Sequence, residues 1–168
     1  MILETARLVL RPLTMGDVEF MVGMWSDPGV NQFIGGPKTP AEIRRKIQDA
    51  VDHQQVHGFA RWAVTLKRNS DLIGLCGPML RLIDKVNEVE LGYAFPRMYW
   101  GLGYATEAAG ASLEHCRRAL GHQRVVAIIH PDNHASIRVI SKIGMHFERS
   151  IEWEPERVNL YCTAASGA

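Results

Sequence analysis

The sequence predicts a mixed α/β (α+β) fold in which helices cover both faces of a mostly antiparallel sheet. Apolar residues repeat at every second position in some segments and with helical spacing in others, and the two kinds of segment alternate along the chain. The expected order is β-α-α-β-β-β-α-β-α-β-β, which makes a seven-stranded sheet. The strand-helix-strand unit in the middle implies a central parallel pair joined by a right-handed crossover.

The first strand is expected at residues 6–13, where leucines alternate with arginines. Thr14 then offers an N-cap and Asp17 an acidic third helical position, so a helix is expected to begin here. Its apolar residues keep a helical spacing as far as Trp25. The turn-forming segment 27–29 is expected to end this helix.

The second helix has the stronger start signal. Residues 39–42 supply a threonine N-cap, a proline at the first helical position and a glutamate at the third. Gly58 is expected to end the helix. The period of the apolar residues then changes to two, which predicts strands at 59–66 and 72–80 joined by a turn at 68–71.

The central unit follows a second turn at residues 84–87. A strand is expected at 88–95, a helix at 103–120 and a β-branched strand at 124–130. Small and apolar residues recur along 103–120 at helical spacing, so this helix should bury one face.

The last part of the chain is expected to hold one helix and a hairpin. The helix should cover residues 133–143, with Gly144 just beyond its end. Strands are expected at 145–153 and 157–163, joined at 154–156.

The whole chain, residues 1–168, is expected to form a single domain, because no linker-like segment divides it. The small and polar residues 163–168 are expected to fray. A net charge of +1 gives no electrostatic footprint for nucleic acid or a membrane surface. No apolar run approaches the ~20 residues of a membrane helix, and the start lacks a signal-peptide pattern. A cytoplasmic location is therefore expected.

Cysteine and histidine spacing gives no sign of a metal or a redox motif. The three cysteines are widely separated and form no CxxC pair, which favours free buried thiols in a reducing compartment. The seven histidines have no metal-ligand spacing either, so no metal is expected.

Residues 100–107 leave a strand and open a helix, which makes them the most informative segment. Gly101, Gly103 and Ala105 are small, so backbone amides there can approach an anion at the positive end of a helix. A dinucleotide fingerprint fails because Thr106 occupies the place of its third small residue. A Walker A loop is absent as well. The alternative is a glycine turn that only closes a corner.

Three blocks of this sequence together resemble a known family. The pattern Trp100-x-x-Gly103-x-Ala105, preceded by Glu90-Leu91-Gly92-Tyr93, resembles motif A of the GNAT superfamily of N-acetyltransferases. The aromatic first position is similar to the Rim-type branch, which includes the ribosomal-protein N-terminal acetyltransferases. Residues 130–144 and 5–13 supply the other two blocks, in the order of the family.

The resemblance implies the GNAT fold, with a splay between the parallel strands at 88–95 and 124–130. It also implies acetyl-CoA as co-substrate, with its pantetheine arm in the splay and its pyrophosphate on the amides of the glycine turn. The cofactor-binding residues that follow from the resemblance are Tyr93, Ala94, Phe95, Gly101, Leu102, Gly103, Tyr104, Ala105, Thr106, Asn133, Ser136 and Lys142.

Two catalytic residues are predicted. Glu90 is the candidate general base, because only a neutral amine attacks a thioester, and the alternative is a structural ion pair. Ser136 is the candidate proton donor to the departing thiolate, or else an ordinary residue of a first helical turn. Asn133 suits both binding of the arm and capping of its helix. Tyr161, on the last strand, is expected in the core, and His130 is expected to be structural.

The acceptor is expected to be a primary amine that attacks in a ternary complex, either a protein N-terminus or a small cationic amine. By the resemblance, segments 31–38 and 152–156 wall the acceptor cleft, and the second of these is acidic with one tryptophan. A backbone N–H near Tyr93 or Ala94 would stabilise the oxyanion. The alternatives are a non-catalytic acyl-CoA sensor and an interaction domain without a ligand. No nucleic acid or membrane partner is expected, and a homodimer remains an open option.

Overall fold

A computed structural model describes residues 3–153 and 156–163. Its strands form one eight-stranded sheet in the order β1-β2-β3-β4-β5-β6-β8-β7. All neighbours are antiparallel except β5 and β6, which are parallel. The strands are β1 (Leu3–Glu4), β2 (Leu8–Pro12), β3 (Trp62–Leu66), β4 (Leu72–Ile83), β5 (Val86–Ala94), β6 (Val126–Ile129), β7 (Met145–Trp153) and β8 (Glu156–Thr163).

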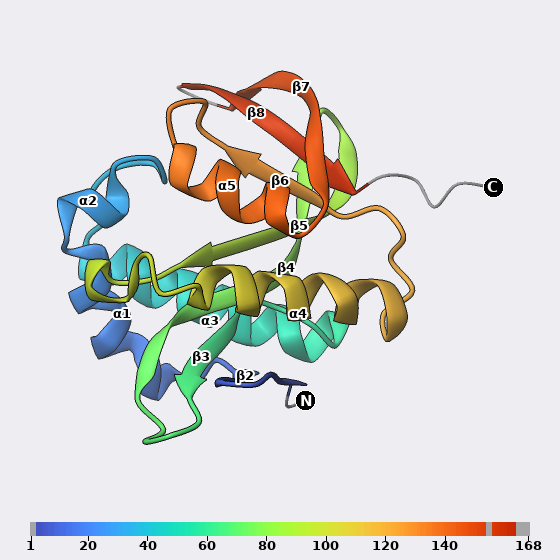
Figure 1. The fold of residues 1–168 in the computed structure, drawn as a ribbon. Helices are drawn as coiled ribbons and strands as arrows, with labels where there is room; N and C mark the ends of the chain where they lie inside the picture. Colours follow the sequence, from blue (N-terminus) through green and yellow to red (C-terminus); the bar gives the residue numbers. More distant parts are fainter. Residues whose placement is uncertain (1–2, 154–155, 164–168) are drawn as a thin grey trace.

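Helices cover both faces of this sheet, as predicted (Figure 1). The helices α1, α2 and α3 pack on one face, and α4 and α5 pack on the other. The described α-helices are α1 (Val18–Trp25), α2 (Pro28–Asn31), α3 (Pro40–His57), α4 (Tyr104–Arg118) and α5 (His134–Lys142). Short 3-10 turns at Met15–Asp17 and Arg97–Tyr99 precede α1 and α4.

Alternation along β3 divides the hydrophobic core between these two faces. Trp62 and Val64 pack toward α4, whereas Ala63 packs toward α1 and α3. On the second side α3 contributes Ile43 and Ile47, which are one helical turn apart and almost fully buried. The core therefore holds the middle of the sheet between two helical layers.

The capping signals for α3 and α5 are confirmed. The Thr39 hydroxyl accepts from the Glu42 amide, and the Glu42 carboxylate accepts from the Thr39 amide at 2.7 Å. Gly58 ends α3 in the left-handed conformation. The side chain of Asn133 caps α5. Local hydrogen bonding sets these boundaries, which is why they could be read from adjacent residues.

Strands β5 and β6 separate soon after they meet. Their parallel pairing is limited to Glu90 opposite Val126, although β5 continues to Ala94 and β6 to Ile129. The predicted splay of the central parallel pair is confirmed. Beyond Glu90, backbone groups of β5 on the β6 side are left open for another extended chain.

The structure differs from the prediction in several details. The sheet has eight strands rather than seven, because the two-residue β1 pairs with β2, and so short a strand has no period to read. The segment 27–29 ends α1 but also begins α2, with the Asp27 carboxylate accepting from the Gly29 amide. Strand β4 runs to Ile83, because a tight turn at Asp84 and Lys85 replaces the longer predicted one.

Thr163 lies in β8 and is buried, while residues 164–168 of the predicted tail lie outside the described residues. The described residues include no helix with the length and apolar character needed to cross a bilayer.

Candidate active site

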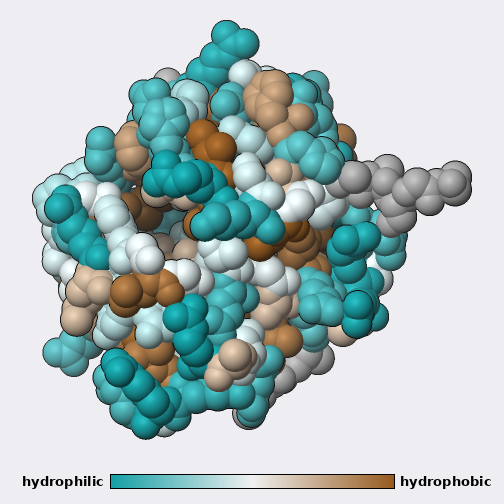
Figure 2. All heavy atoms as spheres, in the orientation of Figure 1, coloured by the Kyte–Doolittle hydropathy of each residue, from teal (hydrophilic) through white to brown (hydrophobic). Residues whose placement is uncertain are grey.

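Two pockets meet at the splay between β5 and β6. Each has a volume of about 490 Å³. We call them the α4–α5 pocket, which runs along the starts of α4 and α5, and the Glu90 pocket, which contains Glu90 on the side of the sheet covered by α1–α3. Figure 2 shows a hollow on the face of the molecule that carries α5, between α2 and α5. Both pockets are lined by Phe33, Ile34, Tyr93, Ala94, Asn133 and Ser136. The shared residues join the two faces of the sheet at one point.

The glycine turn forms one end of the α4–α5 pocket. Gly101 and Gly103 have positive φ angles of 74° and 82°, a conformation that residues with a Cβ rarely adopt. Gly103 caps α4, so the free amides of the first helical turn lie next to the pocket. The Trp100 indole donates to the Phe95 carbonyl at 2.7 Å and ties the turn to the end of β5.

The N-terminal segment holds this turn from the other side. The carboxylate of Glu107 in α4 accepts hydrogen bonds from the Thr5 hydroxyl at 2.5 Å and from the Arg7 amide at 2.9 Å. The Arg7 guanidinium also binds Glu107 at 2.6 Å, donates to the Leu102 carbonyl and lies over the Tyr104 ring. Burial acts to raise the pKa of Glu107, but these hydrogen bonds and the Arg7 charge lower it overall. The block at residues 5–13 and the motif around Trp100 to Glu107 therefore meet in space.

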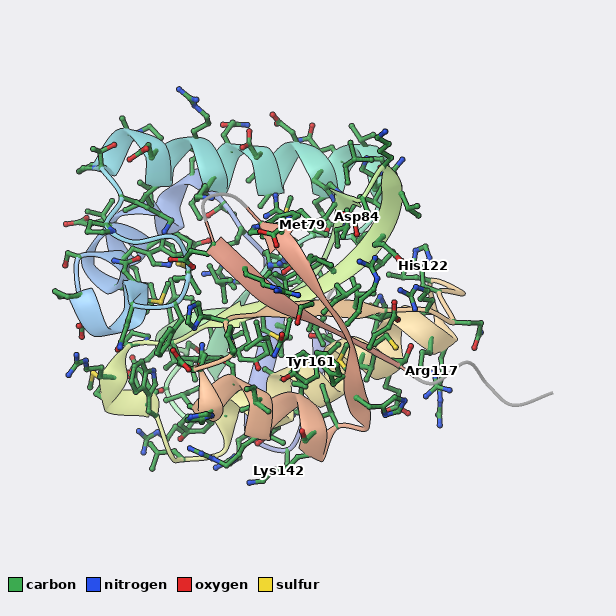
Figure 3. The ribbon with its side chains drawn as sticks, turned by 90° about the horizontal axis from the view of Figure 1, so that it is seen from above. Met79, Asp84, Arg117, His122, Lys142 and Tyr161 are labelled. Carbon is green, nitrogen blue, oxygen red and sulfur yellow. The ribbon has the colours of Figure 1, made fainter. Side chains whose placement is uncertain are left out.

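Helix α5 supplies the opposite wall. The Asn133 side chain accepts from the Ser136 amide at 3.1 Å, so its capping role is observed. The Tyr93 hydroxyl donates to the Ser136 carbonyl at 3.1 Å, and burial raises the pKa of Tyr93. Arg138 and Lys142 add two cations to this wall. Figure 3 shows Lys142 extending outward from the last turn of α5.

Glu90 lies in the second pocket with two arginine partners. Its Oε2 atom is 2.7 Å from Arg61 Nη2 and 3.2 Å from Arg81 Nε. Burial acts to raise the pKa of Glu90, but the charges and hydrogen bonds of both arginines outweigh it, so the pKa is lowered. Oε1 has no partner among the described residues and is left to accept a hydrogen bond. The ion pair considered as an alternative is present, and Glu90 also lines the pocket.

One glycine, Gly92, makes room for the Arg61 side chain. A Cβ on Gly92 would lie 2.3 Å from the Arg61 guanidinium. The same guanidinium donates to the backbone carbonyls of Gly77 and, at 2.8 Å, of Glu90. Arg61 therefore crosses β4 and β5 closely, and a side chain at position 92 would require the Arg61 guanidinium to move.

Most predicted site residues come together. The predicted cofactor residues that line the α4–α5 pocket are Tyr93, Ala94, Phe95, Gly101, Gly103, Ala105, Thr106, Asn133, Ser136 and Lys142. Leu102 and Tyr104 do not line it: Leu102 is half exposed and Tyr104 lies under Arg7. Phe33 from the predicted cleft segment stacks on His130 across the splay. Tyr161 is buried against Phe147 and within the core, as Figure 3 illustrates.

Sequence reasoning predicted Lys142 and included Lys38 in a cleft segment, but it missed the other cations of the two pockets. Arg61 and Arg81 hold Glu90, Lys38 and Lys46 line the same pocket, and Arg138 lines the other. The one available signal was Arg61 within the mostly apolar segment 59–66 that was predicted as a strand. Of the acidic hairpin, Trp153 and Glu156 reach the Glu90 pocket, whereas residues 154–155 lie outside the described residues.

Among the described residues, neither a thiol nor a cluster of metal ligands lies at this site. Burial raises the pKa of both Cys76 and Cys116 to about 12, and Cys162 is free as well. Within residues 3–153 and 156–163, no cysteine lines either pocket and no cluster of metal-ligating side chains occurs.

Residues 7–146 match the acetyltransferase (GNAT) domain family, which is most of the chain. The chain belongs to the GNAT acetyltransferase family. It is 34% identical to the Bacillus subtilis protein YkkB over 150 residues, 89% of this chain and 87% of that protein. It is 30% identical over 149 residues to N-acetyltransferase p20 of Bacillus licheniformis, 87% of this chain and 83% of the relative. This GNAT protein is therefore an acyltransferase.

Solved GNAT structures agree with the fold. An acetyltransferase from Agrobacterium tumefaciens superimposes with a TM-score of 0.86 at 26% identity, over 96% of this chain and 93% of that one. A GNAT acetyltransferase from Bacillus anthracis gives a TM-score of 0.83 at 25% identity, over 99% and 100%. RimL, a ribosomal L7/L12 acetyltransferase solved with coenzyme A, has a TM-score of 0.80 at 19% identity, over 96% and 97%. At that identity RimL supports the fold alone.

Proposed function

We propose that this protein transfers the acetyl group of acetyl-CoA to a primary amine in a ternary complex. The main support for this proposal is that the two pockets open on different sides of the sheet and share six residues at the splay. A cofactor in one pocket and an acceptor in the other can therefore meet at Tyr93, Ala94 and Ser136. Direct transfer suits such a site because no covalent carrier is needed.

The α4–α5 pocket fits acetyl-CoA by the chemistry of its walls. The amides of the glycine turn and of the first turn of α4 suit a pyrophosphate. Arg138 and Lys142 suit further phosphate charge. The open edge of β5 beyond Glu90 and the Asn133 side chain suit the amides of a pantetheine arm.

The reaction forms one N–C bond and breaks one C–S bond. The neutral amine attacks the thioester carbonyl carbon, and a β5 backbone N–H near Tyr93 or Ala94 donates to the carbonyl oxygen as it gains charge. The amine loses one proton and the departing thiolate gains one. Ser136 is our candidate donor of that second proton, because it lines both pockets.

Glu90 is proposed as the entry to a proton relay rather than as a store for the proton. Its lowered pKa keeps it ionised at neutral pH, so it accepts a hydrogen bond through Oε1 and orients the amine or an intervening water. The proton then passes to solvent. The acceptor is a protein N-terminus or a small amine, and the ribosomal-protein acetyltransferases among the structural neighbours motivate the first of these.

Calorimetric titration with acetyl-CoA, with NAD as control, is the first test. Micromolar binding of acetyl-CoA alone is the expected result. Absence of binding at millimolar acetyl-CoA would rule the proposal out, because the glycine turn would then be only a corner.

A kinetic comparison of two glutamates on β5 follows. Glu90→Gln should lower kcat by about 10²-fold with acetyl-CoA binding retained, because the amine loses its hydrogen-bond acceptor. Glu88→Gln is the matched control: it also loses an arginine partner, Arg124 at 3.0 Å, but it does not line the pocket. Equal kcat values for the two variants would remove Glu90 from the mechanism.

A further inference from the structure

Among the described residues, the side chains that line the Glu90 pocket carry more positive than negative charge. Its cations come from the loop before α3, from α3 itself, from the segment before β3 and from β4, and they are Lys38, Lys46, Arg61 and Arg81. Within the described part of the chain, the carboxylates that line it are Glu90 and Glu156. Glu90 is already held by both arginines, and Glu156 is exposed on β8.

The two lysines lack ion-pair partners among the described residues. Lys38 Nζ donates to the backbone carbonyls of Ile34 at 2.7 Å and Gly36 at 2.9 Å, which hold it in place without neutralising it. Burial and the charge of Lys46 lower the pKa of Lys38, against a smaller opposite effect of Glu42. An anion between these lysines would relieve their repulsion.

A neutral side chain with an unpaired donor also lines this pocket. Trp25 lines the Glu90 pocket and is 8% exposed, and its indole N–H has no hydrogen-bond partner among the described residues. Buried N–H groups are rarely left without a partner. The guanidinium of Arg81 also keeps free N–H groups, because its one described bond uses Nε.

We propose that the acceptor is a small primary amine that also carries a carboxylate, as a free amino acid does. Its amine would lie at the splay, near Glu90 and Ser136, and its carboxylate would face Lys38 and Lys46. A volume of about 490 Å³ suits such a molecule. This inference rests on the proposed acetyl transfer, and it argues against polyamines, because their extra positive charges would face the lysines.

The test uses pairs of acceptors that differ in one group. Leucine and leucinamide, and phenylalanine and phenylalaninamide, are acetylated at saturating acetyl-CoA, with spermidine and tetrapeptides of acidic or neutral sequence as further arms. The acid of each pair should have a kcat/KM about tenfold higher, the size expected for a charged hydrogen bond. The amide is less basic and more of it is neutral, so such a preference must come from the protein.

Variants of the two lysines locate the carboxylate. Lys46→Met should reduce the preference for acid over amide by about tenfold, through KM for the acid. Lys38→Met should act in the same direction. Arg44→Met is the matched control, an exposed cation on the same helix that does not line the pocket, and it should keep the wild-type preference.

The results that would overturn this inference differ from those that would overturn acetyl transfer. Equal or faster turnover of the amides, or of spermidine, would overturn the carboxylate and leave acetyl transfer standing. Faster turnover of the tetrapeptides than of every amino acid would overturn the small acceptor. Acetyl-CoA binding without transfer to any amine of the panel would overturn both.

Discussion

At the scale of single residues, the site depends on one buried carboxylate. Glu90 and Arg61 each expose about an eighth of the side chain, so each relies on the other for the interactions that water would supply. Gly92 leaves the space in which Arg61 crosses the strand. Removing one partner of such a pair leaves an uncompensated buried charge, which is more damaging than the pair is stabilising.

We expect Arg61→Met to lower the free energy of unfolding by about 3 kcal/mol at pH 7. The folded-state pKa of Glu90 is lowered, so its contribution is present above the unfolded value of about 4.3 and is lost as pH falls through the folded pKa. The difference between wild type and variant should therefore shrink below about pH 4.3. Urea unfolding at several pH values measures it.

Arg118→Met is the control for this stability measurement. Arg118 pairs with Glu114 on the surface of α4, where both side chains are mostly exposed. Its loss should change the free energy of unfolding by about 0.5 kcal/mol or less. Equal effects of the two variants, or no pH dependence for Arg61→Met, would contradict the buried pair.

At the scale of elements, the start of α4 is shaped by its neighbours as well as by its own glycines. The Glu107 carboxylate on α4 accepts hydrogen bonds from Thr5 and Arg7, and Arg7 also donates to the Leu102 carbonyl. The Trp100 indole fixes the other end of the turn on β5. The amides at Gly101 to Thr106 are thus held in position before any ligand arrives, which lowers the entropy lost on binding.

Substituting two glycines that have the same backbone conformation can distinguish an effect on anion binding from an effect of backbone strain. Gly101 and Gly121 both have φ of 74°, and a Cβ on either would meet open space. Alanine at either position should destabilise the fold by about 1 kcal/mol. Gly101→Ala should also weaken acetyl-CoA binding by about fivefold or more, because its Cβ keeps the phosphate from the amides. Calorimetry and thermal unfolding of both variants check this, and equal affinities would contradict a phosphate site at the turn.

At the scale of the whole molecule, the splay connects two pockets that lie on opposite faces of one sheet. The parallel pairing of β5 and β6 holds the strands together at Glu90, and their separation beyond it connects the two faces. Layers of helices on both sides then give each pocket its own walls. Two substrates can therefore approach from different directions and react without a carrier on the protein.

This arrangement predicts that no acetylated enzyme forms. With acetyl-CoA and no acceptor, mass spectrometry should find the protein unmodified, because the thiols of Cys76 and Cys116 are buried and have pKa values raised to about 12. Initial rates with both substrates varied should give intersecting lines. The variant Cys162→Ser is the control that removes the more accessible thiol, which could be acetylated non-specifically. A stoichiometric acetyl-enzyme that persists in this variant would contradict direct transfer.

Local signals in the sequence determined much of the fold. The capping patterns at Thr39 and Asn133, the glycines of the turn and the change of apolar period placed the helices and most strands. They also indicated the parallel pair, whereas most residues of the α4–α5 pocket were predicted from the resemblance to the GNAT family. Each of these depends on residues close together in the chain, because helix caps and tight turns are satisfied by neighbours.

Only the tertiary structure decided the chemistry around Glu90. Arg61 and Arg81 reach it through the packing of β3, β4 and β5, and Lys38 and Lys46 arrive from the loop before α3 and from α3 itself. The clamp of Thr5 and Arg7 on Glu107 likewise spans a hundred residues of sequence. Charged side chains follow no period when their partners lie on other elements, so the pairing appears only when the sheet and its helices have assembled.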